Sequence, residues 1–127
     1  MKALIIEDNL MNLELAEDLL LDEGFEVTSA EEAVTGIEMA KTSLPDVILM
    51  DLQLPGIDGL QATHILKEDA TTQAIPVIAL TAHAMSHHGA QAREAGCCAF
   101  ITKPIDADTF ADEIREVIEK ESAVTAT

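Results

Sequence analysis

Five side chains suited to phosphoryl chemistry each follow a short aliphatic run in this chain. Glu7 and Asp8 follow residues 3–6, Asp51 follows 47–50, Thr81 follows 77–80 and Lys103 follows 100–102. In an open parallel α/β sheet the carboxyl ends of the strands share one edge, and ligands bind in the crevice there. Three carboxylates, one hydroxyl and one ammonium are therefore expected to meet. We interpret this set as a site for Mg²⁺ and a phosphoryl group.

The charges of these groups indicate what each could do. Three clustered carboxylates would repel one another unless a cation lay among them, and Mg²⁺ needs only two carboxylates and a backbone carbonyl because it usually retains waters. With Mg²⁺ bound, Asp51 becomes a plausible nucleophile towards phosphorus, which would give an aspartyl phosphate. Lys103 and the Thr81 hydroxyl could then hold the phosphoryl oxygens, since phosphoryl transfer depends mainly on positioning and charge stabilisation.

Each of these residues also has an ordinary structural role open to it. Asp8 and Thr81 could be helix N-caps. Asp51 could be a turn residue, and Lys103 a solvated cation. For each residue taken singly, the structural role explains its type and position as well as the chemical role does. Their joint placement after apolar runs at one sheet edge favours a functional site.

Composition limits the classes of partner. The chain has 127 residues, with 7 basic and 24 acidic side chains and a formal net charge of -17. Such a surface repels nucleic acid and anionic membranes, because binding to either depends on Lys and Arg. No apolar run approaches the ~20 residues of a membrane span. An immediate N-terminal strand leaves no room for a secretory signal, and adjacent cysteines 97 and 98 make no disulfide framework, so a cytoplasmic protein is expected.

Hydrophobic periodicity predicts five strands that alternate with five helices. The strands are expected over residues 2–7, 25–28, 46–50, 76–80 and 98–102. The helices are expected over residues 9–23, 31–42, 59–68, 84–95 and 107–120. Asp8 or Asn9 should cap the first helix and Asp106 the last, while Gly24 and Gly96 should end the first and fourth.

This alternation specifies a doubly wound α/β domain with a five-stranded parallel sheet. Right-handed crossovers with a single reversal favour the strand order 2-1-3-4-5. The domain is expected to span residues 1–121. Residues 122–127 show no pattern and are expected to form a short disordered tail.

The residues after the strands resemble the motifs of response regulator receiver domains. The stretches that carry the resemblance are Glu7-Asp8-Asn9, Leu49-Met50-Asp51, Pro55-Gly56-Ile57-Asp58-Gly59, Leu80-Thr81-Ala82 and Lys103-Pro104. The resemblance spans residues 2–120 and implies a CheY-like, flavodoxin-like fold. It also implies a phosphoryl-accepting switch of a two-component system or phosphorelay. Such a protein catalyses its own aspartyl phosphorylation and slow dephosphorylation, and turns over no external substrate. No output domain follows, so the resemblance is to stand-alone receivers.

The resemblance assigns a role to each site residue. Asp51 would accept phosphate from a phosphohistidine of a sensor histidine kinase or a histidine phosphotransfer protein. Asp8, Asp51 and the Gln53 carbonyl would bind Mg²⁺, for which Mn²⁺ can substitute, and Glu7 would assist through water. Lys103 and Thr81 would contact the phosphoryl group. The resemblance also implies a cis peptide bond before Pro104, which is uncommon even for X-Pro bonds.

By the same resemblance, Phe100 occupies a switch position where Tyr or His is usual. Because Phe has no hydroxyl, a switch here cannot use a hydrogen bond from the ring. We expect Thr81 to move towards a bound phosphoryl group, small Ala82 to leave room, and Phe100 to turn into the space behind Thr81. The face formed by residues 84–120 would then change and bind a downstream protein. A fixed core role for Phe100 is the alternative.

Met11 and Leu15 lie four residues apart, on a different stripe of the first helix from its core-facing residues. Exposed apolar side chains beside a site often mark a docking surface. We predict that they pack, near Pro104, against a helical histidine-bearing partner. Filling the core is their alternative role.

Three other classes of protein share parts of this pattern. A haloacid dehalogenase-type phosphatase needs a second Asp two positions after the nucleophile, where this chain has Gln53. In a flavodoxin-like flavin carrier, Glu7 and Asp8 would repel the flavin phosphate. A non-phosphorylated interaction module would not need the complete set of active residues. Signal output and a role as a phosphate sink both remain open from the sequence.

Overall fold

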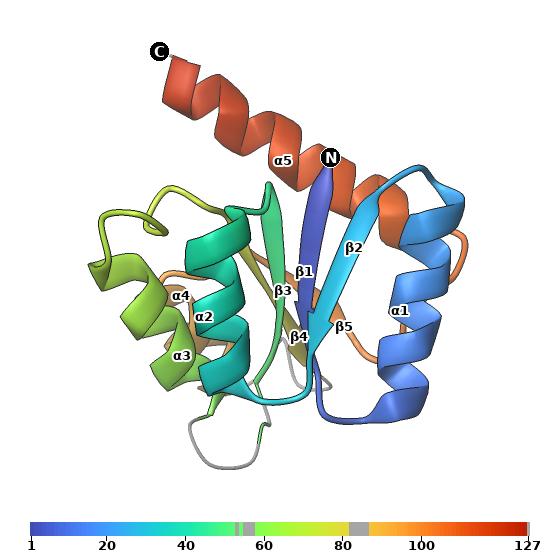
Figure 1. The fold of residues 1–127 in the computed structure, drawn as a ribbon, viewed down its shortest axis with the longest axis horizontal. Helices are drawn as coiled ribbons and strands as arrows, with labels where there is room; N and C mark the ends of the chain where they lie inside the picture. The colour runs from blue at the N-terminus through green and yellow to red at the C-terminus, as the bar shows by residue number, and fades with distance from the viewer. Residues whose placement is uncertain (53, 55–57, 82–86, 127) are drawn as a thin grey trace.

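The fold is a parallel β-sheet with helices on both faces (Figure 1). The computed structural model describes residues 1–52, 54, 58–81 and 87–126. The five strands of the described residues lie in the order β2-β1-β3-β4-β5, as predicted. They are β1 (Lys2–Ile6), β2 (Glu26–Ala30), β3 (Val47–Asp51), β4 (Val77–Thr81) and β5 (Ala99–Thr102).

Two helices cover one face of the sheet and three cover the other. Helices α1 (Leu10–Asp22) and α5 (Phe110–Ala126) pack on one face, and α2 (Ala33–Ser43), α3 (Gly59–Glu68) and α4 (His87–Ala95) on the other. All strands point towards the same edge, while the chain start and the end of α5 lie at the opposite edge (Figure 1). No helix within the described ranges has the length and apolar character needed to cross a membrane.

Alternation along the central strands divides the core into two clusters. In β1, Leu4 and Ile6 pack under α2 and α3, whereas Ala3 and Ile5 pack under α1 and α5. Both faces of β1, β3 and β4 are therefore buried, which is why these strands are continuous aliphatic runs. Strand β2 alternates between exposed and less exposed residues, as its predicted edge position requires.

The predicted N-cap and the predicted terminal glycine of the first helix are both confirmed. Of the two candidate caps, Asn9 is the one used: its side chain accepts a hydrogen bond from the Asn12 N–H at 3.1 Å. Gly24 follows the helix with φ of +87°, a conformation that favours glycine. The start of the fourth helix at residue 84 lies outside the described residues, and that helix ends before Gly96 as predicted.

Most predicted limits shift by one or two residues, and the differences at the second strand and the last helix have a clear physical reason. The second strand was expected at residues 25–28, but it runs from Glu26 to Ala30 because all five residues pair with β1. Phe25 is excluded because its N–H donates to Leu20 O at 3.0 Å and closes the end of α1.

The last helix was expected at residues 107–120, but α5 begins at Phe110 and continues to Ala126, through most of the expected tail. Residues 107–109 form a turn over Asp106, whose side chain accepts the Asp108 N–H. Glu, Lys and Ala in the final stretch favour helix, and no Gly or Pro stops it.

A carboxylate site at the carboxyl edge of the sheet

The site lies where the connections from neighbouring strands diverge. Strands β1 and β3 are adjacent, but the chain leaves β1 towards β2 on one side and leaves β3 towards β4 on the other. Such a switch point opens a crevice at the carboxyl ends of the strands. Glu7 stands directly after β1, where its N–H donates to Ala30 O at 3.0 Å, and Asp51 is the last residue of β3.

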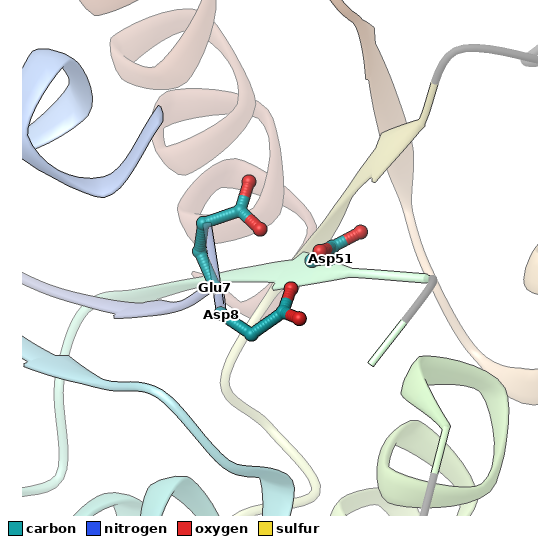
Figure 2. Close-up of side chains that lie close together, drawn as sticks. All are labelled: Glu7, Asp8 and Asp51. Carbon is teal, nitrogen blue, oxygen red and sulfur yellow. The ribbon is translucent and has the colours of Figure 1, made fainter. Parts of the chain in front are cut away.

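Three carboxyl groups gather in this crevice, as predicted. Figure 2 shows Glu7 and Asp8 after β1 beside Asp51 at the end of β3. One carboxylate oxygen from each of the three residues lies within 4.8 Å of the others. Glu7 and Asp51 are only 1% and 2% exposed, whereas Asp8 is open to solvent. Two of the three charges are therefore held away from water.

Lys103 reaches the same carboxylates from the end of β5. Its Nζ lies 2.8 Å from Glu7 Oε1 and 3.3 Å from Asp51 Oδ1. The backbone holds the side chain there, because the Lys103 N–H donates to Thr81 O at 2.9 Å. The expected cis peptide bond between Lys103 and Pro104 is confirmed. Burial alone would lower the pKa of Lys103, but its contacts with Glu7 and Asp51 outweigh burial and raise that pKa.

The pKa of Glu7 is strongly raised. Burial, and then its contact with Asp51, raise the pKa of Glu7 from 4.5 to about 7, although Lys103 partly opposes this. The Asn9 N–H donates to Oε2 at 3.4 Å. Within the described part of the chain, Oε1 accepts no hydrogen bond of acceptable geometry, even though the ammonium is within ion-pair distance. Glu7 thus has a buried oxygen with capacity for a further ligand.

The donor set fits a hard divalent cation. Mg²⁺ binds oxygen ligands at about 2.1 Å in an octahedron, so its ligand atoms lie about 3–4 Å apart. Carboxylate oxygens within 4.8 Å of one another can reach that spacing with small rotations. The buried Oε1 of Glu7, which accepts no hydrogen bond from the described residues, also fits a nearby cation or a water bound to one. The acidic set agrees with the expected metal, while Gln53 lies outside the described residues.

The other predicted site residues lie around this cluster. Thr81 is buried at the end of β4, next to the β5 end that carries Lys103. Phe100 is half-buried on β5, and Pro104 is exposed. Met11 and Leu15 are 82% and 40% exposed, so the alternative in which they fill the core is wrong. Ala82 lies outside the described residues.

Gly59 is a residue of the site to which the sequence analysis gave no role beyond the start of the third helix and a place in a receiver-like motif. A Cβ atom at this position would collide with the Asp51 carbonyl oxygen and lie 2.7 Å from Leu52 Cα. The preceding Asp58 caps α3, because its Oδ1 accepts the Gln61 N–H at 2.9 Å. A glycine just inside a well-capped helix, where propensity disfavours it, was the signal that could have revealed this close approach.

Comparison with known proteins identifies the class. Residues 3–115 match the response regulator receiver domain family, and the chain belongs to that family. Receiver domains are signalling proteins that bind Mg²⁺ at an acidic site and interact with histidine kinases and downstream targets. This membership favours the receiver interpretation over a phosphatase or a flavin carrier.

Relatives and solved structures agree with this class. The polar-differentiation response regulator DivK of Brucella ovis is 39% identical over 115 residues, which cover 91% of this chain and 94% of that protein. The receiver domain of sensor histidine kinase PA1611 from Pseudomonas aeruginosa is 28% identical, with a TM-score of 0.82 and 94% of each chain covered. That structure has a magnesium ion coordinated in its active-site cleft.

A third likeness concerns the fold alone. Chemotaxis protein CheY4 of Vibrio cholerae is 21% identical, with a TM-score of 0.87 over 91% of this chain and 97% of that chain. The predicted CheY-like fold is therefore confirmed. The resemblance to single-domain receivers is also confirmed, because the match covers 94% of DivK, which therefore has little sequence outside the receiver domain.

Proposed function

We propose that Asp51 accepts a phosphoryl group from a phosphohistidine of a sensor histidine kinase or a histidine phosphotransfer protein. The observation that carries this proposal is the set of charged groups around the buried carboxylate of Asp51. Asp51 Oδ1 lies 3.3 Å from Lys103 Nζ, and the carboxylates of Glu7 and Asp8 are close by. An acid held beside both a cation and a metal-binding acidic pair is suited to attack phosphorus.

The transfer needs no external co-reactant. A carboxylate oxygen of Asp51 forms a bond to phosphorus, and the bond between phosphorus and the histidine nitrogen breaks. That nitrogen keeps the electron pair, and a proton from the solvent makes the departing imidazole neutral. Lys103 and the Thr81 hydroxyl bind phosphoryl oxygens as charge moves onto them. Later attack by water on phosphorus breaks the bond to the Asp51 oxygen, which returns the carboxylate and releases phosphate. The protein would thus catalyse its own slow dephosphorylation.

Asp8, Asp51, the Gln53 carbonyl and, through water, Glu7 would hold Mg²⁺, and Mn²⁺ can substitute. When bound, the cation offsets the charge of the carboxylates and of the incoming phosphoryl oxygens. The buried Glu7 oxygen and the mutual approach of the three carboxylates support this assignment.

The phosphodonor would dock on α1. Met11 and Leu15 are exposed on this helix, which begins two residues after Asp8. Pro104, exposed beside Lys103, would border the same surface. A helical partner that covers these side chains would bring its phosphohistidine to Asp51.

The output would be a change in the face formed by α4, β5 and α5, through Thr81, Ala82 and Phe100. A downstream protein, and no nucleic acid, would bind this face. The formal net charge of -17 supports a protein partner over nucleic acid. We also propose that the protein works in the cytoplasm, an expectation supported by its two free cysteines.

Metal-dependent labelling tests this function. Incubation with acetyl phosphate and Mg²⁺ or Mn²⁺ should add one phosphoryl group, measured by intact mass. EDTA in excess should prevent the addition, and restored Mg²⁺ should recover it. Full phosphorylation in EDTA would contradict the proposal.

A further inference from the structure

One guanidinium lies over the ring that the receiver resemblance marks as the switch aromatic. Arg93 Cζ, on α4, is 5.0 Å from the centroid of the Phe100 ring on β5. A cation within about 6 Å of a ring centroid is attracted to the ring face. Only 7 residues of the chain are basic, against 24 acidic ones. A cation over this ring is therefore not a by-product of abundant basic side chains.

Phe100 lies beside a small residue on the sheet, on the same face as Thr81. The ring is half-buried and packs against the apolar cluster on the α2–α4 side of the sheet. In the sheet, Phe100 is paired in register with Ala79 of β4, which has a small side chain. Thr81 lies two residues further along β4 and so on the same face. In the proposed switch, the ring leaves its position beneath Arg93 and turns across Ala79 towards Thr81.

We propose that Arg93 is a positioning residue that holds Phe100 beneath its guanidinium in the unphosphorylated protein. The stacking exists only when the ring lies beneath Arg93. It therefore stabilises that packing and lowers the population of the packing in which the ring has turned towards Thr81. Phe100 has no hydroxyl with which to bond a neighbour, and the guanidinium is the polar partner that fixes its position. This inference rests on the proposed function, because it concerns the regulation of the same site.

The proposal predicts a change in ligand affinity at a distance. Beryllofluoride, which mimics the phosphoryl group, should bind Arg93→Gln about two- to five-fold more tightly than the wild type, the factor expected from an exposed cation–π contact. The affinity rises because the ligand no longer has to displace the ring from beneath the cation. Coupling between two positions is reciprocal, so beryllofluoride should also move the ring.

The chain is well suited to the measurement. It contains only three phenylalanines, 25, 100 and 110, so ¹³C-labelled phenylalanine gives three sets of ring signals. The wild type, Arg93→Gln and Arg93→Lys are titrated with beryllofluoride in the presence of Mg²⁺ and followed by NMR. Buried Phe110 reports whether each variant is folded. Arg93→Lys keeps the charge and should restore part of the wild-type behaviour.

Arg115→Gln is the matched control. Arg115 also stacks on a phenylalanine, with Cζ 5.6 Å from the Phe25 centroid. Phe25 belongs to the core cluster on the α1–α5 side of the sheet, whereas Phe100 packs on the opposite side. This variant should shift the signals of Phe25 and leave the beryllofluoride affinity unchanged. A second comparison places Arg93→Gln in a Phe100→Leu background, where removal of the guanidinium should have no added effect.

The outcomes separate the two proposals. Wild-type affinity of Arg93→Gln for beryllofluoride would overturn the role of Arg93 while leaving the phosphoryl site intact. An undiminished effect of Arg93→Gln in Phe100→Leu would also overturn it, because the charge would then act without the ring. Failure of the wild type to bind beryllofluoride would contradict the proposed function itself.

Discussion

Lys103 Nζ lies 2.8 Å from Oε1 of the buried Glu7, so an ammonium occupies the place where the carboxylates face one another. The same ammonium is 3.3 Å from Asp51. Asp8 and Asp51 would hold Mg²⁺, whose charge would offset that of the acids, and Lys103 would then be free to bind the phosphoryl group. The contact between Lys103 and Glu7 is therefore the resting arrangement of the site.

The raised pKa of Glu7 predicts how Mg²⁺ affinity depends on pH. In the metal-free protein this pKa is about 7, against an ordinary value of 4.5, so Mg²⁺ must displace a proton below neutral pH. The dissociation constant should fall by up to about tenfold per unit as the pH rises towards 7, and then level off. Isothermal titration calorimetry in buffers of different ionisation enthalpy measures both the affinity and the released proton.

A control variant and a stability prediction sharpen this test. Glu7→Gln cannot release a proton, so its Mg²⁺ affinity should vary less with pH. Because the folded-state pKa is raised, the stability that Glu7 contributes is complete below pH 4.5 and is lost as the pH rises through about 7 in metal-free protein. A wild-type affinity that stays constant from pH 6 to 8 would count against this account of Glu7.

Gly59 should prove necessary for the position of Asp51. Gly59→Ala places a methyl group against the Asp51 carbonyl oxygen and should cost about 1–3 kcal/mol of unfolding free energy, as overpacking does. It should also weaken Mg²⁺ binding, because the Asp51 backbone must move. Urea unfolding and a Mg²⁺ titration measure the two effects.

Gly24→Ala is the control for this prediction. Gly24 has a positive φ but open space around it, so alanine there should cost about 1 kcal/mol through backbone strain alone. Its Mg²⁺ affinity should match the wild type. If Gly59→Ala also bound Mg²⁺ with wild-type affinity, the proposed link between α3 and Asp51 would be wrong.

The strand pattern predicted most of the fold and the acidic site. Central strands such as β3 are buried on both faces, so their aliphatic runs stand out, and the residue after each run falls at the shared edge. The limits of the edge strand β2 were harder to predict, because they depend on pairing with β1 rather than on the side chains of β2. The length of α5 was missed because its last turns have helix-forming composition without a clear apolar stripe.

Contacts between distant segments could not be read from local patterns. Gly59 lies against the Asp51 backbone, and Arg93 lies over Phe100, because helices pack on the sheet at positions set by the whole core. The ion pair between Lys103 and Glu7 likewise joins opposite ends of the chain. Sequence spacing placed Glu7 and Lys103 at one edge of the sheet but did not give the contact between them or the resulting pKa of Glu7.

The docking role of α1 predicts a donor-specific defect. Met11→Lys and Leu15→Lys should slow phosphotransfer from a protein donor by about tenfold or more, because truncation at an interface anchor typically costs over 1 kcal/mol. Labelling by acetyl phosphate should be unchanged. Leu21→Lys is the control, since Leu21 is also exposed on α1 but lies in its last turn, away from the site. Equal slowing with both donors would eliminate the docking role.

The most direct test of the central claim is the site of phosphorylation. Wild-type protein, Asp51→Asn and Asp58→Asn are incubated with acetyl phosphate and Mg²⁺ and then compared by intact mass and by hydroxylamine sensitivity. Asp58→Asn controls for loss of a nearby acid, because asparagine keeps the cap of α3. We predict one hydroxylamine-sensitive phosphoryl group on the wild type and on Asp58→Asn, and none on Asp51→Asn. Labelling of Asp51→Asn to the wild-type extent would contradict the account.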